Sequence, residues 1–210
     1  MKFNIYEDPD MLFNRTNAIP FSCALLVKHF AKSSVLSCPY LDIVYQERAY
    51  QGFKVRTLIY NVRESITLLT GTKRKRLVLQ NMLYGTMPME IESIGTVVLN
   101  ENTCALIQYD SNQHACFLEP GKYQTIYFEY AKDILQKQQS ESAVVDQWLH
   151  QLQFDKCFLY HQDVDVDALK KMQHEITSMI IDSPLREELF RVKMQQSLLM
   201  LLESKQLLTQ

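Results

Sequence analysis

The chain has 210 residues, of which 47% are hydrophobic and 22% are charged, and its formal net charge is −2. These proportions exclude a disordered chain, and the near-neutral charge creates no overall field that would recruit nucleic acid. No apolar run approaches the roughly 18 residues of a membrane span, and the start MKFNIYEDPD lacks the apolar core of a secretory signal. We therefore expect a cytoplasmic protein with no membrane partner.

The front of the chain is rich in turn-forming residues. All five glycines and five of the six prolines lie within the first 121 residues, and these residue types separate short strands. Strands are expected in an apolar run at 20–27 and then at 40–50, 53–61, 65–70, 77–83, 90–94, 96–99, 103–109, 114–118 and 123–130. With no room for crossover helices, they predict an antiparallel sandwich or barrel, which can enclose a ligand cavity.

Two of these strands show their faces directly. Two sets of residues alternate between positions 53 and 60, which predicts a half-buried strand: Phe53, Val55, Thr57 and Ile59 on one face, and Lys54, Arg56, Leu58 and Tyr60 on the other. The Gln51-Gly52 pair before this strand is suited to a hairpin turn. In the last strand, residues 123, 125 and 127 share one face, and residues 126, 128 and 130 share the other.

The tail changes to a helical period. A short helix is expected at 131–138, and a second helix begins after Ser142, with Val145, Trp148, Leu149 and Leu152 on one face. An extra strand is expected at 157–160. A third helix follows, whose apolar positions are Leu169, Met172, Ile176, Met179 and Ile180. Ser183-Pro184 begins a last helix of over twenty residues, with Leu185, Leu189, Val192 and Leu199 along one side. Its end, 198–202, is apolar all round, so this helix must be buried in its own domain or against a partner.

The predicted fold class is therefore α+β. Residues 1–130 form an antiparallel β-barrel or jelly roll, and residues 131–210 form a helical segment packed on it. The tail carries more acidic than basic residues, which argues against direct DNA binding by these helices.

The five cysteines, Cys23, Cys38, Cys104, Cys116 and Cys157, are odd in number and widely spaced, with no CxxC pair. This pattern favours reduced, mostly buried thiols over a disulfide framework.

One close pair of metal-type ligands occurs, His114 and Cys116, which would share a strand face about 7 Å apart. Cys104 on a neighbouring strand could complete a zinc site. The favoured interpretation is a strand with a buried thiol and an exposed histidine. No motif places an acid that would orient a Cys/His nucleophile pair, so no catalytic or metal-binding residues and no cofactor are predicted.

Other polar features identify no ligand contact. The basic run from Lys73 to Arg76 is interpreted as the solvated start of a strand, with phosphate or an acidic partner as the alternative. No phosphate-binding glycine loop occurs. Six tyrosines lie on predicted strands: Tyr45, Tyr50, Tyr60, Tyr109, Tyr123 and Tyr127. They are equally consistent with the wall of a small-molecule pocket and with an ordinary sheet, in which aromatic residues are common. The ligand-binding residues are therefore unknown at this level.

Two stretches resemble a known family. Residues 117–130, FLEPGKYQTIYFEY, resemble the last barrel strand in the N-terminal sensor region of bacterial AraC-type transcription regulators. The stretch from Asp167 to Leu202 is similar to the helical segment that follows that barrel. The resemblance implies a cupin-like barrel at 1–130 that binds a small effector, and a segment at 131–210 that dimerises. Such regulators continue into two helix-turn-helix units, so we expect a fragment or a stand-alone relative.

The leading hypothesis is thus the ligand-sensing and dimerisation module of an AraC-type regulator, a homodimer through its C-terminal helices. The alternative is a stand-alone cupin-like interaction protein whose apolar last helix docks a partner. The metal-ligand histidines of enzymatic cupins are missing, so the chain is expected not to be an enzyme.

Overall fold

The computed structural model of the chain describes residues 2–71, 76–91, 94–109, 113–131, 134, 136, 159–161 and 166–206. The helix expected after Ser142, with its apolar face, lies outside these residues, as do most of 131–138 and of the basic run. The elements are β1 (Lys2–Ile5), β2 (Asn14–Thr16), the 3-10 helix η1 (Phe21–Leu26), β3 (Ser33–Ser37), β4 (Leu41–Tyr50), β5 (Phe53–Val62), β6 (Ile66–Gly71), β7 (Arg76–Tyr84), β8 (Met87–Ile91), β9 (Gly95–Leu99), β10 (Cys104–Tyr109), β11 (Gln113–Leu118), β12 (Gly121–Tyr130), β13 (Leu159–His161), α3 (Val166–Ser178) and α4 (Pro184–Gln206).

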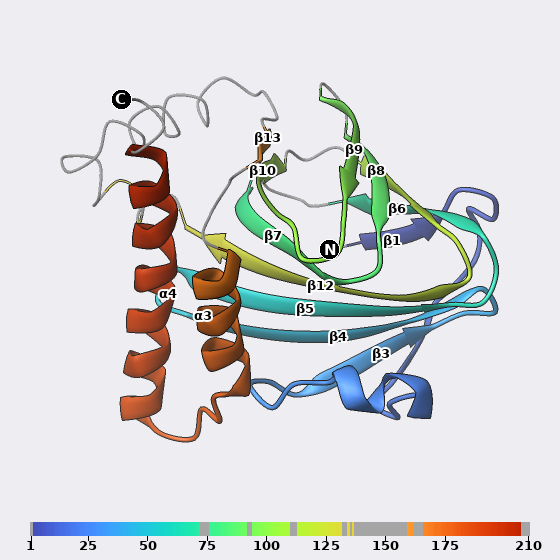
Figure 1. The fold of residues 1–210 in the computed structure, drawn as a ribbon. Coiled ribbons are helices and arrows are strands. Elements are labelled where there is room, and N and C mark those ends of the chain that lie inside the picture. Colours follow the sequence, from blue (N-terminus) through green and yellow to red (C-terminus); the bar gives the residue numbers. More distant parts are fainter. Residues whose placement is uncertain are drawn as a thin grey trace.

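Eight consecutive strands, β5 to β12, pair in a nested way. β5 pairs with β12, β6 with β11, β7 with β10 and β8 with β9, all antiparallel. Further pairing of β12 with β7 and of β11 with β8 folds this long ribbon over on itself. The result is a jelly roll, the double-sheet architecture of cupins, and with the helices at its side it confirms the predicted α+β class (Figure 1).

The remaining strands extend the two sheets. The smaller sheet has the order β1-β6-β11-β8-β9, and the larger sheet has the order β13-β10-β7-β12-β5-β4-β3-β2. The short strands β1, β2 and β3 were not predicted, because they are too brief to show a period. The strand expected at 90–94 is instead Met87–Ile91, and Gly95 with a φ of 91° turns the chain into β9.

The apolar run at 20–27 is not a strand, and that prediction was wrong. It forms η1, in which Phe21 and Leu25 are each 98% exposed while Cys23 is buried. A 3-10 helix repeats every three residues, so Cys23 and Leu26 face the sheet together and pack near Val44. A run of apolar residues cannot reveal this period.

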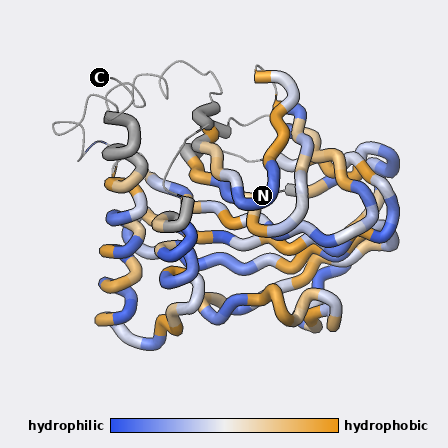
Figure 2. Tube along the Cα trace, viewed as in Figure 1, coloured by the Kyte–Doolittle hydropathy of each residue, from blue (hydrophilic) through white to orange (hydrophobic). Residues whose placement is uncertain are grey.

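The central strands are buried on both faces, so β5 is not the half-buried strand expected. In β5 only Lys54 and Asn61 fall short of full burial. One face packs in the barrel core between the two sheets, a cluster that includes Leu58 and Tyr60. The other face, including Val55, packs against α3 and α4. The strands therefore need apolar residues on both sides, which Figure 2 shows as orange segments recurring along them.

The helices cover the outer face of the larger sheet. Ile176 of α3 and Phe190, Met194 and Leu198 of α4 join Phe128 of β12 in one buried cluster. Figure 1 shows the two helices side by side near the hairpin that joins β4 and β5. Within the described part of the chain, no helix has both the length and the apolar character that a membrane crossing requires.

Candidate functional site

A line of polar side chains crosses the inner face of the larger sheet. The strand registers place Glu47 of β4 opposite Arg56 of β5, Arg56 opposite Tyr127 of β12, and Tyr127 opposite Gln80 of β7. These four residues are called the polar row below. They face the barrel, because residues two positions away on the same strands, such as Leu58, lie in the barrel core.

Arg56 is the centre of the polar row. Its Nε and Nη2 donate to Glu47 Oε2 at 3.0 and 2.7 Å, and Nε also donates to the Tyr45 hydroxyl at 3.2 Å. Its guanidinium carbon lies 5.6 Å from the centre of the Tyr45 ring, and Nη2 lies 3.9 Å from Glu129 Oε2. The Arg56 side chain is only 5% exposed, so these carboxylates compensate a charge that water barely reaches.

The ionisation states in the polar row follow from its surroundings. Burial alone would raise the pKa of Glu47, but hydrogen bonds from Tyr45 and Arg56 outweigh burial and hold this pKa below its ordinary value. Burial raises the pKa of Tyr45 and of Tyr127 to about 12 each. At neutral pH the barrel thus presents a guanidinium, a carboxylate and two neutral phenols, a set that can both donate to and accept from the polar groups of a small molecule.

The facing wall of the barrel belongs to the smaller sheet. There His114 and Cys116 share the inner face of β11, as the sequence spacing predicts, but His114 is 1% exposed rather than solvated. The reason is that Cys116 and Leu118, on the same face, lie in the barrel core. Burial also raises the pKa of the Cys116 thiol to about 12.

The three-ligand zinc alternative does not assemble around this pair. Cys104 packs in the cluster beneath the helices, on the opposite face of the larger sheet from the barrel interior, whereas Cys116 lies inside the barrel. Among the described residues, no group of three or more histidine, cysteine or acidic side chains is arranged to hold a metal ion. Cys23, Cys38, Cys104 and Cys116 are all free and buried.

The tyrosines divide between the two faces. Tyr45, Tyr60, Tyr123 and Tyr127 line the barrel side, and Tyr50 packs on the helix side. The side chain of Tyr109 lies outside the described residues.

The polar row itself was missed in the sequence analysis, although one signal was available. A hairpin turning at Gln51-Gly52 brings Glu47 opposite Arg56, and the structure has this register. The partners Tyr127 and Gln80 come from distant segments, so no local pattern reveals them.

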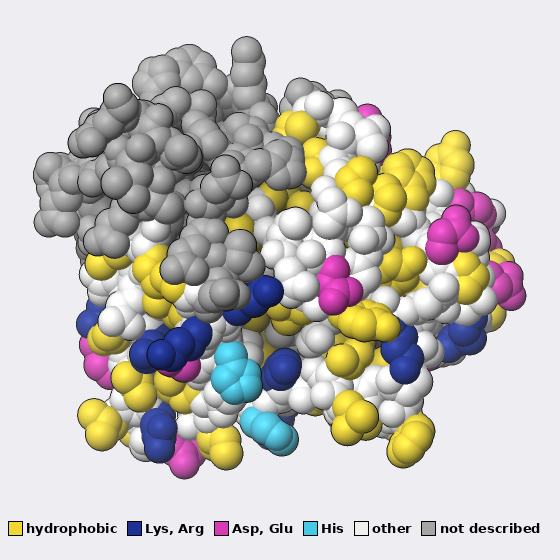
Figure 3. All heavy atoms as spheres, in the orientation of Figure 1, with side chains coloured by type: hydrophobic (Ala, Val, Ile, Leu, Met, Phe, Trp, Pro, Cys, Tyr) yellow, Lys and Arg dark blue, Asp and Glu magenta, His cyan; other side chains and the backbone are white. Residues whose placement is uncertain are grey.

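The four dimer-helix candidates share the outer side of α4. Leu185 is 81% exposed, and Leu189, Val192 and Leu199 are 39%, 39% and 38% exposed. The opposite side of the helix is buried through Phe190, Met194 and Leu198. On the face drawn in Figure 3, hydrophobic side chains reach the surface over α4. These four residues are called the outer stripe below.

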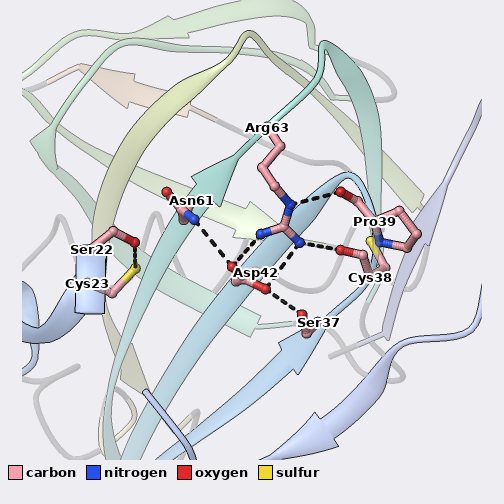
Figure 4. Close-up of polar contacts among 8 residues, drawn as sticks. All are labelled: Ser22, Cys23, Ser37, Cys38, Pro39, Asp42, Asn61 and Arg63. Carbon is pink, nitrogen blue, oxygen red and sulfur yellow. Dashed lines mark hydrogen bonds and ion pairs between the residues drawn. The ribbon is translucent and has the colours of Figure 1, made fainter. Parts of the chain in front are cut away.

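A second polar cluster lies near the turn between β3 and β4 (Figure 4). Arg63 donates from Nη1 to Asp42 Oδ2 at 2.6 Å and from Nε to the Pro39 carbonyl at 2.8 Å. Asn61 donates to the same carboxylate at 3.2 Å, and the Ser37 hydroxyl donates to its other oxygen. Burial alone would raise the pKa of Asp42, but these hydrogen bonds hold it below its ordinary value. Because they close a turn, we interpret this cluster as structural.

Comparison with known proteins supports no assignment by sequence. No family model matches the chain, and no curated protein matches it. Among solved structures, the AraC-like transcriptional activator CuxR is similar with a TM-score of 0.47 and 6% identity over 73% of this chain. The cupin domain of Schizosaccharomyces pombe Cnp3 is similar with a TM-score of 0.35 and 10% identity, over 61% of this chain and 89% of that one.

These likenesses concern the fold alone, and the nested strand pairing is the stronger evidence for it. The chain spans about half the length of the AraC-like activator, 54% of it.

The prediction that the chain is not an enzyme has to be corrected. Solved structures similar to this chain include DMSP lyases, with a TM-score of 0.35 and 11% identity over 42% of this chain and 47% of that one. They also include oxalate decarboxylase, with a TM-score of 0.35 and 10% identity over 60% of this chain and 32% of that one. One scaffold supports many activities, because chemistry depends on the residues of a site. The fold therefore neither excludes catalysis nor demonstrates it.

Proposed function

We propose that this chain is the ligand-sensing and dimerisation module of a bacterial, cytoplasmic AraC-type transcription regulator. In this proposal residues 1–130 are the sensor domain, with a small effector bound at the polar row. Residues 131–210 are the dimerisation segment, in which the outer stripe of α4 pairs with that of a second subunit.

The observation that carries the sensor half is the buried charge of Arg56. A buried ion pair contributes little to stability, and apolar residues of similar volume are often as stable or more so. A barrel that needed only to fold would therefore be filled with apolar side chains, as most of this interior is. Charged and phenolic groups gathered in one place inside an apolar wall are the usual composition of a small-molecule site.

The dimerisation half is supported by the spacing and exposure of the outer stripe. Leu185, Leu189, Val192 and Leu199 follow one another at steps of four, three and seven residues, the spacing of a coiled-coil seam. All four are exposed in the single chain, and a row of exposed apolar side chains marks an interaction surface.

The effector half can be tested by thermal denaturation in the presence of a panel of sugars, nucleotides, carboxylic acids and amino acids. We expect at least one compound to raise the melting temperature of the wild-type protein and to lose most of that effect in Arg56→Met. Arg63→Met is the matched control, because it removes an arginine paired with a carboxylate outside the polar row. An equal shift in Arg56→Met and in the wild type would refute binding at the polar row.

The dimer half can be tested by sedimentation. We expect Leu189→Lys to be a folded monomer, since Leu189 is partly exposed, while Ile180→Lys remains dimeric. Ile180 is a matched control because it is 61% exposed but lies outside α4. A strictly monomeric wild-type protein would refute the homodimer and favour the alternative, an interaction protein that docks a different partner through α4.

A further inference from the structure

The two carboxylates that face Arg56 are each followed by a residue that holds α4. On β4, Glu47 points into the barrel and Arg48 points out of it. On β12, Glu129 points inward and Tyr130 points outward. This arrangement follows from strand geometry, since successive side chains lie on opposite faces of a sheet.

Both outward residues make a direct polar contact with the helix. Arg48 Nη2 lies 2.7 Å from Glu187 Oε1 in the first turn of α4. The Tyr130 hydroxyl lies 2.8 Å from Ser197 Oγ, and both side chains are buried. Because Ser197 Oγ itself donates to the Met194 carbonyl, the Tyr130 hydroxyl is the donor in its contact with Ser197.

The two contacts hold α4 at well-separated points. Glu187 and Ser197 are ten residues apart in the helix, which corresponds to about 15 Å along its axis. A movement of β4 relative to β12 would therefore tilt or turn α4 rather than translate it. The outer stripe lies on the other side of the same helix, so such a rotation changes how that stripe is presented.

We infer that the polar row and α4 are energetically coupled through the pairs Glu47-Arg48 and Glu129-Tyr130. A ligand group that binds the Arg56 guanidinium competes with Glu47 and Glu129. The backbone of β4 and β12 then carries the change, one residue further on, to Arg48 and Tyr130. This inference deepens the proposed function, on which it rests, by naming how occupancy of the barrel would regulate pairing through α4.

The coupling can be measured on the 210-residue chain without a ligand, by hydrogen exchange resolved by mass spectrometry. We compare Glu129→Gln, which preserves the side-chain shape, with Arg56→Met, which removes the central charge. In both variants the α4 amides are expected to exchange about threefold faster or more, relative to amides of the smaller sheet in the same sample. That internal reference separates a local effect from global destabilisation.

Arg63→Met is the control, because it disrupts an arginine-carboxylate pair outside the polar row, in which Arg63 contacts Asp42 near the start of β4 and the Pro39 carbonyl of the β3–β4 turn. It should leave the relative exchange of α4 unchanged. The inference is overturned if Arg63→Met accelerates α4 as much as Arg56→Met does, or if neither Glu129→Gln nor Arg56→Met accelerates α4 beyond the smaller sheet.

A double-mutant comparison tests the route itself. In a Tyr130→Phe background, Glu129→Gln should add little to α4 exchange, because the contact with Ser197 is already lost. In a Tyr123→Phe background, Glu129→Gln should keep its full effect, since the Tyr123 hydroxyl donates to the Glu119 carbonyl elsewhere. Equal effects in both backgrounds would overturn the route through Tyr130.

The outcome is separable from that of the proposed function. The exchange measurement on the variants uses no ligand, so its result still tests the coupling if no effector or dimer is found. Conversely, a compound that binds at the polar row without changing α4 exchange would overturn the coupling alone.

Discussion

Two neighbouring residues of α4 lie on different faces of the helix, one buried and one partly exposed, and their substitution by alanine should separate the contributions of these faces. Phe190 is fully buried in the cluster between the helices and the larger sheet. Leu189 belongs to the outer stripe and is 39% exposed. We therefore compare Phe190→Ala with Leu189→Ala. Both substitutions place alanine at adjacent positions of one helix, so the effects of helix propensity on stability should be similar.

The expected losses differ because only one substitution opens a cavity. Truncation of a fully buried phenylalanine costs about 3–5 kcal/mol, the sum of lost transfer free energy and the cavity left behind. A partly exposed leucine contributes about 1 kcal/mol in a single chain. A domain of this kind has a free energy of unfolding of about 5–15 kcal/mol, so Phe190→Ala should remove about a fifth of it or more.

The measurement is urea unfolding followed by far-UV circular dichroism, with free energies from linear extrapolation. It is made at two protein concentrations, because subunit association stabilises the native state by mass action. The loss in Leu189→Ala should grow with concentration if the outer stripe pairs, whereas the larger loss in Phe190→Ala should already be present in dilute protein. If Leu189→Ala costs as much as Phe190→Ala in dilute protein, the described orientation of α4 is wrong.

Three further predictions concern the barrel. The folded-state pKa of Asp42 is lowered. The stability that the Asp42 carboxylate contributes is therefore present above its unfolded pKa of about 3.9 and is lost as pH falls through the folded pKa. In Asp42→Asn, the free energy of unfolding should consequently depend less on pH in the acid range. Burial raises the pKa of Cys104 to about 11. The stability that the buried neutral thiol contributes is therefore complete below about pH 8.5 and is lost as pH rises towards 11. In Cys104→Ala, the free energy of unfolding should consequently depend less on pH in the alkaline range. Gly85→Ala should cost about 1–3 kcal/mol more than Gly95→Ala in urea unfolding, because its Cβ would lie 2.8 Å from the Tyr123 ring while that at Gly95 meets open space.

Each of these predictions has an outcome that contradicts it. An Asp42→Asn variant with the acid unfolding profile of the wild type would mean that the Arg63 contact does not lower the Asp42 pKa. Rapid alkylation of Cys104 in the folded protein at neutral pH would contradict its burial. Equal losses in Gly85→Ala and Gly95→Ala would show that backbone conformation alone sets the cost, since both glycines have positive φ.

Local patterns carried much of the architecture. The Gln51-Gly52 pair predicts the hairpin turn that joins β4 and β5. The cap at Ser183 and the proline after it predict the start of α4, which begins at Pro184. These features depend on residues close in sequence, so single-chain propensities are sufficient to predict them.

The alternation of apolar and polar residues along a strand does not show which face of the strand points into the barrel, or whether the other face is covered by helices. Arg56 and His114 therefore looked solvated, yet both are buried. The run at 20–27 looked like a strand, yet it forms η1, since only packing against Val44 selects a period of three.

The sequence by itself determined the order of elements, strands first and helices afterwards, because glycine, proline and hydrophobic period act locally. Only the tertiary structure decided that Glu47, Arg56, Tyr127 and Gln80 form one row inside the barrel. Their meeting depends on nested pairing between strands as distant as β5 and β12, and no local preference specifies a contact across that length of chain.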